Sequence, residues 1–130
     1  MLALWAGALV SICAVAAPTA FAVLADRSAA GQVAGRLFLT VTIIGVVTAA
    51  LLFAMQWIAK VNLQRAGLPI AIAALAPLSS ELVLGPLMAA ARSAGNMARF
   101  GMLHGVAALL LAIACVSACV ALWKISRPAA

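Results

Sequence analysis

Charged residues are scarce in this chain of 130 residues, and acidic ones are nearly absent. Charged side chains make up 8% of the residues and hydrophobic ones 68%, and Asp26 and Glu81 are the two acids. The mean hydropathy is +1.28. A soluble domain of this size covers its surface with charged side chains. The composition therefore excludes a soluble domain and predicts an integral membrane protein in contact with the lipid bilayer.

The residue groupings that carry most enzyme chemistry are missing as well. No nucleophile–base–acid set, glycine-rich phosphate loop or pair of carboxylates is visible, so we expect no enzymatic activity. Eight Lys and Arg residues give a net charge of +6, but they lie scattered near the ends of apolar runs. That arrangement suits lipid headgroups. A nucleic-acid partner would need a basic cluster with interleaved aromatic residues, so we expect none.

The cysteines offer no disulfide framework. The chain has three cysteines, an odd number: Cys13, Cys115 and Cys119. All three lie inside apolar runs, and none forms a Cys-x-x-Cys pair. The first apolar run has no Lys or Arg before it, so the charged region of a secretory signal is missing. We expect the first segment to insert without cleavage.

Long apolar runs dominate what remains. A spanning helix needs about 20 apolar residues, and four segments meet that requirement: residues 2–24, 37–58, 68–87 and 101–123. The connection at 60–67 is short, which indicates an antiparallel hairpin, while 26–36 and 91–99 form the other two connections. We predict an all-α fold, a single transmembrane domain over residues 1–130. It is a bundle of four transmembrane helices in two hairpins, with both termini on the same side.

Small residues and prolines mark expected contacts and kinks within these spans. Ala3, Gly7 and Ser11 recur every four residues in the first span, and Gly101 and Gly105 do so in the fourth. Such stripes let another helix approach closely, so we predict helix packing there.

Proline and arginine recur in a similar order in the two halves of the chain. Pro18 is placed to kink the first span. Ala17-Pro18 followed by Arg27 is similar to Gly85-Pro86 followed by Arg92. The hypothesis is that the chain consists of two related hairpins.

Residues 81–105 hold the most unusual polar residues of the chain. Glu81 lies within a predicted span, where an ionised carboxylate is costly and usually faces a partner, water or the bundle interior. Counted from the last connection, Glu81 and His104 lie within about a turn of equal depth. We therefore expect a Glu81–His104 interaction, with Arg99 nearer the surface. The alternative is that Glu81 is uncharged and only ties helices together.

A metal site is a further possibility on the fourth span. Thioether, thiolate and imidazole groups suit copper(I), and four candidates lie there: Met102, His104, Cys115 and Cys119. Because His104 and Cys115 are about three turns apart, they would act as a relay rather than as one site. The alternatives are a hydrogen-bonding histidine and two small buried cysteines.

Four short motifs carry a family resemblance: Leu4-Trp5-x-Gly7, Ala17-Pro18-x-x-Phe21, Pro86-x-Met88-x-x-x-Arg92 and Phe100-x-x-Leu103-His104-Gly105. On these, the chain resembles the bacterial relatives of transmembrane protein 205, the domain of unknown function 4149. The resemblance implies a four-helix protein of the bacterial inner membrane and no particular reaction. It also implies that asparagine is common near Glu81, so Glu81 departs from the pattern. A fainter likeness, through Trp5-x-Gly7, to the membrane domains of copper-resistance protein D implies metal handling.

Three functions fit these observations. The first is a structural or accessory subunit of a membrane complex; separately, we expect the chain to contact other membrane chains or to form a homo-oligomer. The second is a transporter or permeation element using Glu81 and His104, with Arg92, Pro18 and Pro86 as further candidates. The third is the handling of copper or another metal.

Basic residues leave the orientation balanced. Each side of the membrane receives four: Arg27, Arg36, Arg92 and Arg99 on one, and Lys60, Arg65, Lys124 and Arg127 on the other. The positive-inside rule therefore gives no preference. Because Lys60 and Arg65 share the shortest connection, we expect both termini to be cytoplasmic.

Overall fold

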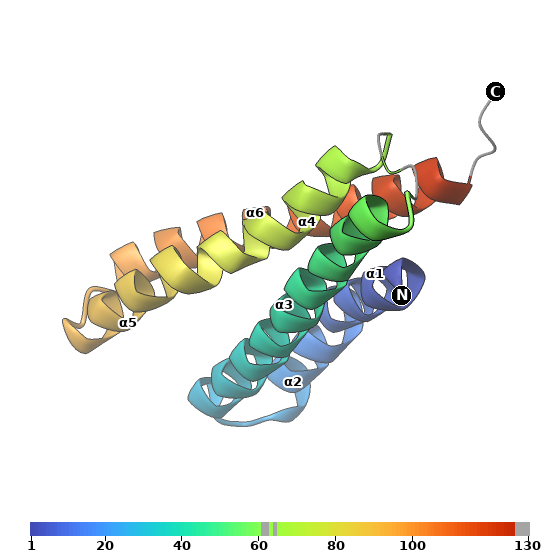
Figure 1. Cartoon of the computed structure of the whole chain (residues 1–130). Helices are drawn as coiled ribbons and strands as arrows, with labels where there is room; N and C mark the ends of the chain where they lie inside the picture. The colour runs from blue at the N-terminus through green and yellow to red at the C-terminus, as the bar shows by residue number, and fades with distance from the viewer. Residues whose placement is uncertain (61–62, 64, 127–130) are drawn as a thin grey trace.

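The computed structural model describes residues 1–60, 63 and 65–126 as four long helical spans. No strand occurs among these residues, and all four spans are long and apolar enough to cross a membrane. The predicted all-α fold of four transmembrane helices is confirmed. Consecutive spans run in opposite directions, so α1 begins and α6 ends at the same end of the molecule (Figure 1). Part of the predicted 60–67 connection lies outside the described residues.

The odd-numbered spans are interrupted, and the even-numbered spans are continuous. The first span consists of α1 (Leu2–Ser11), η1 (Ile12–Ala16) and α2 (Ala17–Val23), and the third of α4 (Gly67–Ser79), η2 (Ser80–Leu84) and α5 (Gly85–Ser93). The second span is α3 (Arg27–Ile58), and the fourth is α6 (Met97–Ser126). The elements η1 and η2 are short stretches of π-helix.

Each π-helical stretch lies directly before an X-Pro pair. The N–H of Ala17 bonds to the carbonyl of Ile12, and the N–H of Gly85 bonds to that of Ser80, both five residues back. Proline has no N–H, and in an α-helix its ring clashes with the carbonyl four residues earlier. The wider π turn makes room for Pro18 and Pro86. A π turn therefore precedes Pro18 and also Pro86 in the second hairpin, and the kink at Pro18 stays a prediction.

The connections between α2 and α3 and between α5 and α6 are shorter than predicted. Asp26 caps α3 by accepting a hydrogen bond from the N–H of Ser28 at 2.8 Å, and Asn96 caps α6 by accepting one from the N–H of Arg99 at 3.0 Å. These caps satisfy N–H groups that a helix start leaves free. Most of the predicted connections at 26–36 and 91–99 is therefore helical, and the caps extend α3 and α6 beyond the predicted spans.

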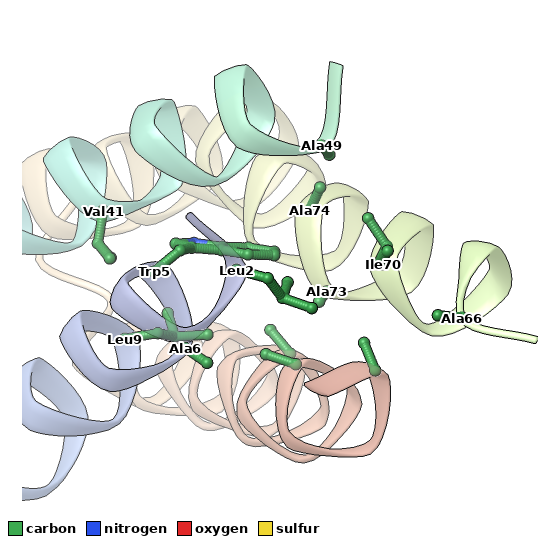
Figure 2. Packing of buried hydrophobic residues seen from close by; sticks show 13 residues of the cluster. Leu2, Trp5, Ala6, Leu9, Val41, Ala49, Ala66, Ile70, Ala73 and Ala74 are labelled. Atoms are coloured by element: carbon green, nitrogen blue, oxygen red, sulfur yellow. The ribbon is translucent and has the colours of Figure 1, made fainter. Parts of the chain in front are cut away.

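The two hairpins meet at one end and diverge at the other (Figure 1). At the shared end, α1 contacts α3 and α6, and α4 contacts α3 and α6. The buried apolar cluster lies there: Leu2, Trp5, Ala6, Leu9, Val41, Ala49, Ala66, Ile70, Ala73, Ala74, Ala114, Ala118 and Ala121 (Figure 2). Beyond it, α2 packs on α3 and α5 packs on α6. The molecule is thus two hairpins joined by one compact core.

Trp5 is the largest side chain of this core and is only 2% exposed. It extends from α1 towards α3 (Figure 2), where Gly45 leaves room for it. A Cβ atom at Gly45 would lie 2.5 Å from the indole nitrogen and 2.6 Å from two ring carbons. The indole N–H finds no hydrogen-bond partner in the part of the chain described here. Shape complementarity rather than hydrogen bonding therefore holds the ring.

Gly45→Ala tests this contact. We expect the added methyl group to lower the free energy of unfolding by about 1–3 kcal/mol, because the indole and α3 must move apart. Gly105→Ala is the matched control, since nothing lies within 4 Å of its Cβ position. It should leave stability unchanged or raise it by up to about 1 kcal/mol. Unfolding of the detergent-solubilised protein, titrated with SDS, measures both. Equal stability of the two variants would contradict the packing of Trp5.

Candidate functional site

Glu81 lies in the π-helical stretch η2, four residues after the buried Pro77. Its side chain is half-buried, and it has no hydrogen bond or ion pair with any residue that the structure describes. Because Pro86 lacks an N–H, one backbone donor is missing a turn after Glu81. The second hairpin thus combines a carboxyl group and a local interruption of its helical hydrogen bonds within one span.

The hypothesised pair between Glu81 and His104 is not formed. Glu81 lies about 18 Å along its helix from the connection end at Ser93, whereas His104 lies about 10 Å from the start of α6 at Met97. Counted from Arg92 and Asn96 of the predicted connection, the two depths differ by three residues, whereas counted from the helix ends at Ser93 and Met97 they differ by five. The difference exceeds one helical turn, and the exposed His104 contacts a different residue.

His104 stacks on Phe100, one turn earlier on α6. The two ring centres are 6.0 Å apart and the planes differ by 11°. Arg92 of α5 places its guanidinium carbon 4.6 Å from the centre of the Phe100 ring, within reach of a cation–π interaction. Phe100 therefore brings Arg92 and His104 together across the α5–α6 connection. The spacing of four between Phe100 and His104 was the available signal, because such residues share a helical face.

The remaining charged and proline candidates lie apart from this group. Arg99 is exposed, and its backbone N–H donates to the Asn96 cap. Pro86 is exposed in the first turn of α5, and Pro18 is exposed in the first turn of α2 in the other hairpin. The predicted candidates thus do not come together in one site.

The predicted small-residue stripes are not packing faces within this chain. Gly7 and Ser11 are exposed, because α1 turns Trp5 and its neighbours inward instead. Apart from its own turn of helix, no described residue lies within 4 Å of a Cβ placed at Gly7, Gly101 or Gly105. Packing of these residues against another chain stays a prediction.

The first hairpin also has a glycine pair with an open face, and this pair was not predicted from the sequence. Gly31 and Gly35 also have nothing within 4 Å. They stand five and nine residues after the Asp26 cap, and Gly101 and Gly105 stand at the same positions after the Asn96 cap. The Gly-x-x-x-Gly spacing was a visible signal in the sequence.

The predicted metal candidates do not converge. Met102 is 67% exposed, His104 stacks on Phe100, and Cys119 is exposed. Over the described ranges, no group of three or more His, Cys, Asp or Glu side chains is placed to hold an ion. Cys115 instead contacts Cys13 of the first hairpin, with the sulfur atoms 3.4 Å apart. Sequence reasoning could not find this pair, because nothing in the local pattern relates residues so far apart.

Comparison with known proteins gives one match. The model of a family described as a domain of unknown function (DUF4149) matches residues 1–97. No curated protein and no solved structure matches the chain. The likeness to copper-resistance protein D is therefore unsupported.

Replacing Glu81 tests whether its carboxyl group stabilises the fold. A carboxyl group within a span is costly, and no described side chain compensates for it. We expect Glu81→Gln and Glu81→Leu to be at least as stable as the unmodified protein in the SDS titration. The control is the other acid: Asp26→Ala removes a helix cap and should cost about 1 kcal/mol. A loss of about 3 kcal/mol or more for either Glu81 variant would reveal a buried pair and contradict this description.

Proposed function

Because the chain belongs to the DUF4149 family, whose description names no activity, we propose a function from its architecture. The protein is a small, non-enzymatic integral membrane protein that binds another transmembrane chain as a structural or accessory subunit. The observation that carries this proposal is an open glycine face on each hairpin at the diverging end: Gly31 with Gly35 on α3, and Gly101 with Gly105 on α6.

The open faces have the composition of a helix-binding surface. Gly31 and Gly35 on α3, and Gly101 and Gly105 on α6, leave free space where side chains would otherwise stand. Within a bilayer the lipid tails are as apolar as the helices, so close van der Waals packing drives association. Small residues four apart permit that approach. Each hairpin therefore offers a partner helix a surface that its own chain leaves unfilled.

The arrangement of the hairpins supports the same conclusion. At the shared end, four helices surround a core, whereas at the other end each hairpin is a pair of helices. The exposed apolar side chains beyond the core include Val33 and Leu39 on α3 and Met102 and Val106 on α6. They suit lipid or a partner helix. We place the complex in the bacterial inner membrane, with both termini cytoplasmic.

A transporter or permeation element is the second candidate, and Glu81 favours it. Interrupted helices whose unpaired carbonyls lie within the membrane form cation sites in transport proteins. Glu81 stands in such an interruption, one turn before Pro86, which removes a backbone donor. A copper-handling role has less support, because its candidate ligands lie apart.

Native mass spectrometry of the protein extracted from its own membrane in mild detergent tests the accessory function. We expect a larger membrane chain in a fixed ratio. Gly31→Ile with Gly35→Ile, or Gly101→Ile with Gly105→Ile, should reduce the bound partner at least tenfold, because the new side chains fill the open faces. Ala54→Ile on α3 and Ala112→Ile on α6 are matched controls, since both alanines are exposed. They place an isoleucine elsewhere on the same helices and should retain the partner.

Two results would contradict the accessory function. One is a homo-oligomer without any other chain, which would favour transport and make Glu81 the first residue to replace. The other is equal loss of the partner in the glycine variants and the alanine controls, which would show that the open faces do not select it.

A further inference from the structure

Cys13 and Cys115 join the two hairpins at the place where they begin to diverge. Cys13 lies in the π-helical stretch η1, one turn after the fully buried Leu9, and Cys115 follows the fully buried Ala114 on α6. Both cysteines are half-buried at the margin of the core cluster. Their sulfur atoms are 3.4 Å apart, although 102 positions separate them in the sequence. The contact therefore exists because of how the hairpins pack.

We propose that Cys13 and Cys115 are a modification site, at which a reversible disulfide fastens the two hairpins. A disulfide bond is about 2.05 Å long, so the sulfur atoms need to approach by about 1.4 Å. Rotation of two short side chains can supply a movement of that size. The S–S bond forms as both S–H bonds break. The two protons and two electrons pass to a neutral, membrane-permeant two-electron acceptor, such as a quinone, which is reduced to the quinol.

The chemistry of the site favours a disulfide over a bound metal ion. Two thiols and a disulfide are all neutral, so oxidation leaves no charge in an apolar region. A monovalent ion held by two thiolates would carry a net negative charge there, and a buried unpaired charge is costly. No third ligand from His, Cys, Asp or Glu joins the two sulfur atoms within the described part of the chain.

An open apolar surface of α6 gives an oxidant access to Cys115 from the lipid. The surface is formed by Cys115, Val116, Cys119, Val120 and Trp123, and a neutral oxidant dissolved in the bilayer can reach it. Cys119 lies on the same surface and is exposed, one turn away from the contact with Cys13.

The disulfide would control the junction between the hairpins. In the thiol form, the hairpins are joined by the chain connection between α3 and α4 and by non-covalent packing of the core. In the disulfide form, η1 and α6 are linked covalently beside the core. This inference goes beyond the proposed function, because it holds whatever chain or ion the diverging end binds.

Thiol counting in lipid nanodiscs tests the proposal. The reduced protein is treated with diamide, a neutral membrane-permeant azo oxidant, then unfolded in SDS, alkylated with N-ethylmaleimide and weighed by intact mass spectrometry. We expect alkylated thiols to fall from three to one in the unmodified protein and from two to none in Cys119→Ser. Cys13→Ser and Cys115→Ser should each keep two. Dithiothreitol should restore the original counts.

Peptide mapping of the oxidised, unmodified protein makes the test independent of how the variants fold. The expected product is a single linked peptide pair containing Cys13 and Cys115. Three free thiols after oxidation, a Cys115–Cys119 link that persists in Cys13→Ser, or a link between two chains would each overturn the proposal.

Discussion

The contact between Trp5 and Gly45 is the constraint on which the rest of the structure depends. In a bilayer, transferring an apolar side chain from lipid to protein gains little, so helices associate where their surfaces fit closely. At the shared end, the indole fills the space that Gly45 leaves on α3. Ala114, Ala118 and Ala121 let α6 approach closely as well, and all three are fully buried. Beyond the core, Gly31, Gly35, Gly101 and Gly105 meet no side chain of the described residues, and the hairpins diverge (Figure 1).

The same local structure recurs in both hairpins. Each begins with a helix that passes through a π turn into an X-Pro pair, and each continues through a three-residue connection to a capped, uninterrupted helix. The glycine pairs follow their caps at equal distances. These shared features support the hypothesis of two related hairpins. The halves differ where chemistry is concentrated: the first contributes Cys13 and Trp5 to the junction, and the second carries Glu81 in its π turn.

Much of the fold was predictable, because hydropathy alone requires four spans and short connections require antiparallel neighbours. Helix lengths were underestimated, since Asp26 and Asn96 cap helices in regions whose polarity suggested loops. The packing face of α1 was also unpredictable. The small-residue stripe at Gly7 and Ser11 predicted that this face of α1 would be buried. The buried face is instead the one with Trp5, because Gly45 on α3 leaves room for the indole. A pattern within α1 alone does not contain that information.

The candidate site was harder to predict than the fold. The depth of a residue in the membrane depends on where its helix ends. A shift of one residue at each helix end was enough to give Glu81 and His104 clearly different depths. The contact between Cys13 and Cys115 depends on how the hairpins cross, which no local pattern encodes. By contrast, the Phe100–His104 stack and the glycine pairs obey simple helical spacing, and the sequence contained both signals.

Distances between spin labels at the two ends of the molecule test the central claim most directly. One cysteine pair, Ala25→Cys with Ala94→Cys, reports on the diverging end, and another, Ala59→Cys with Ile125→Cys, reports on the shared end. All four residues are exposed, and native cysteines are replaced by serine. Double electron–electron resonance in nanodiscs should give a clearly longer distance for the first pair than for the second. Equal distances, as in a closed four-helix bundle, would contradict two hairpins joined only at one end.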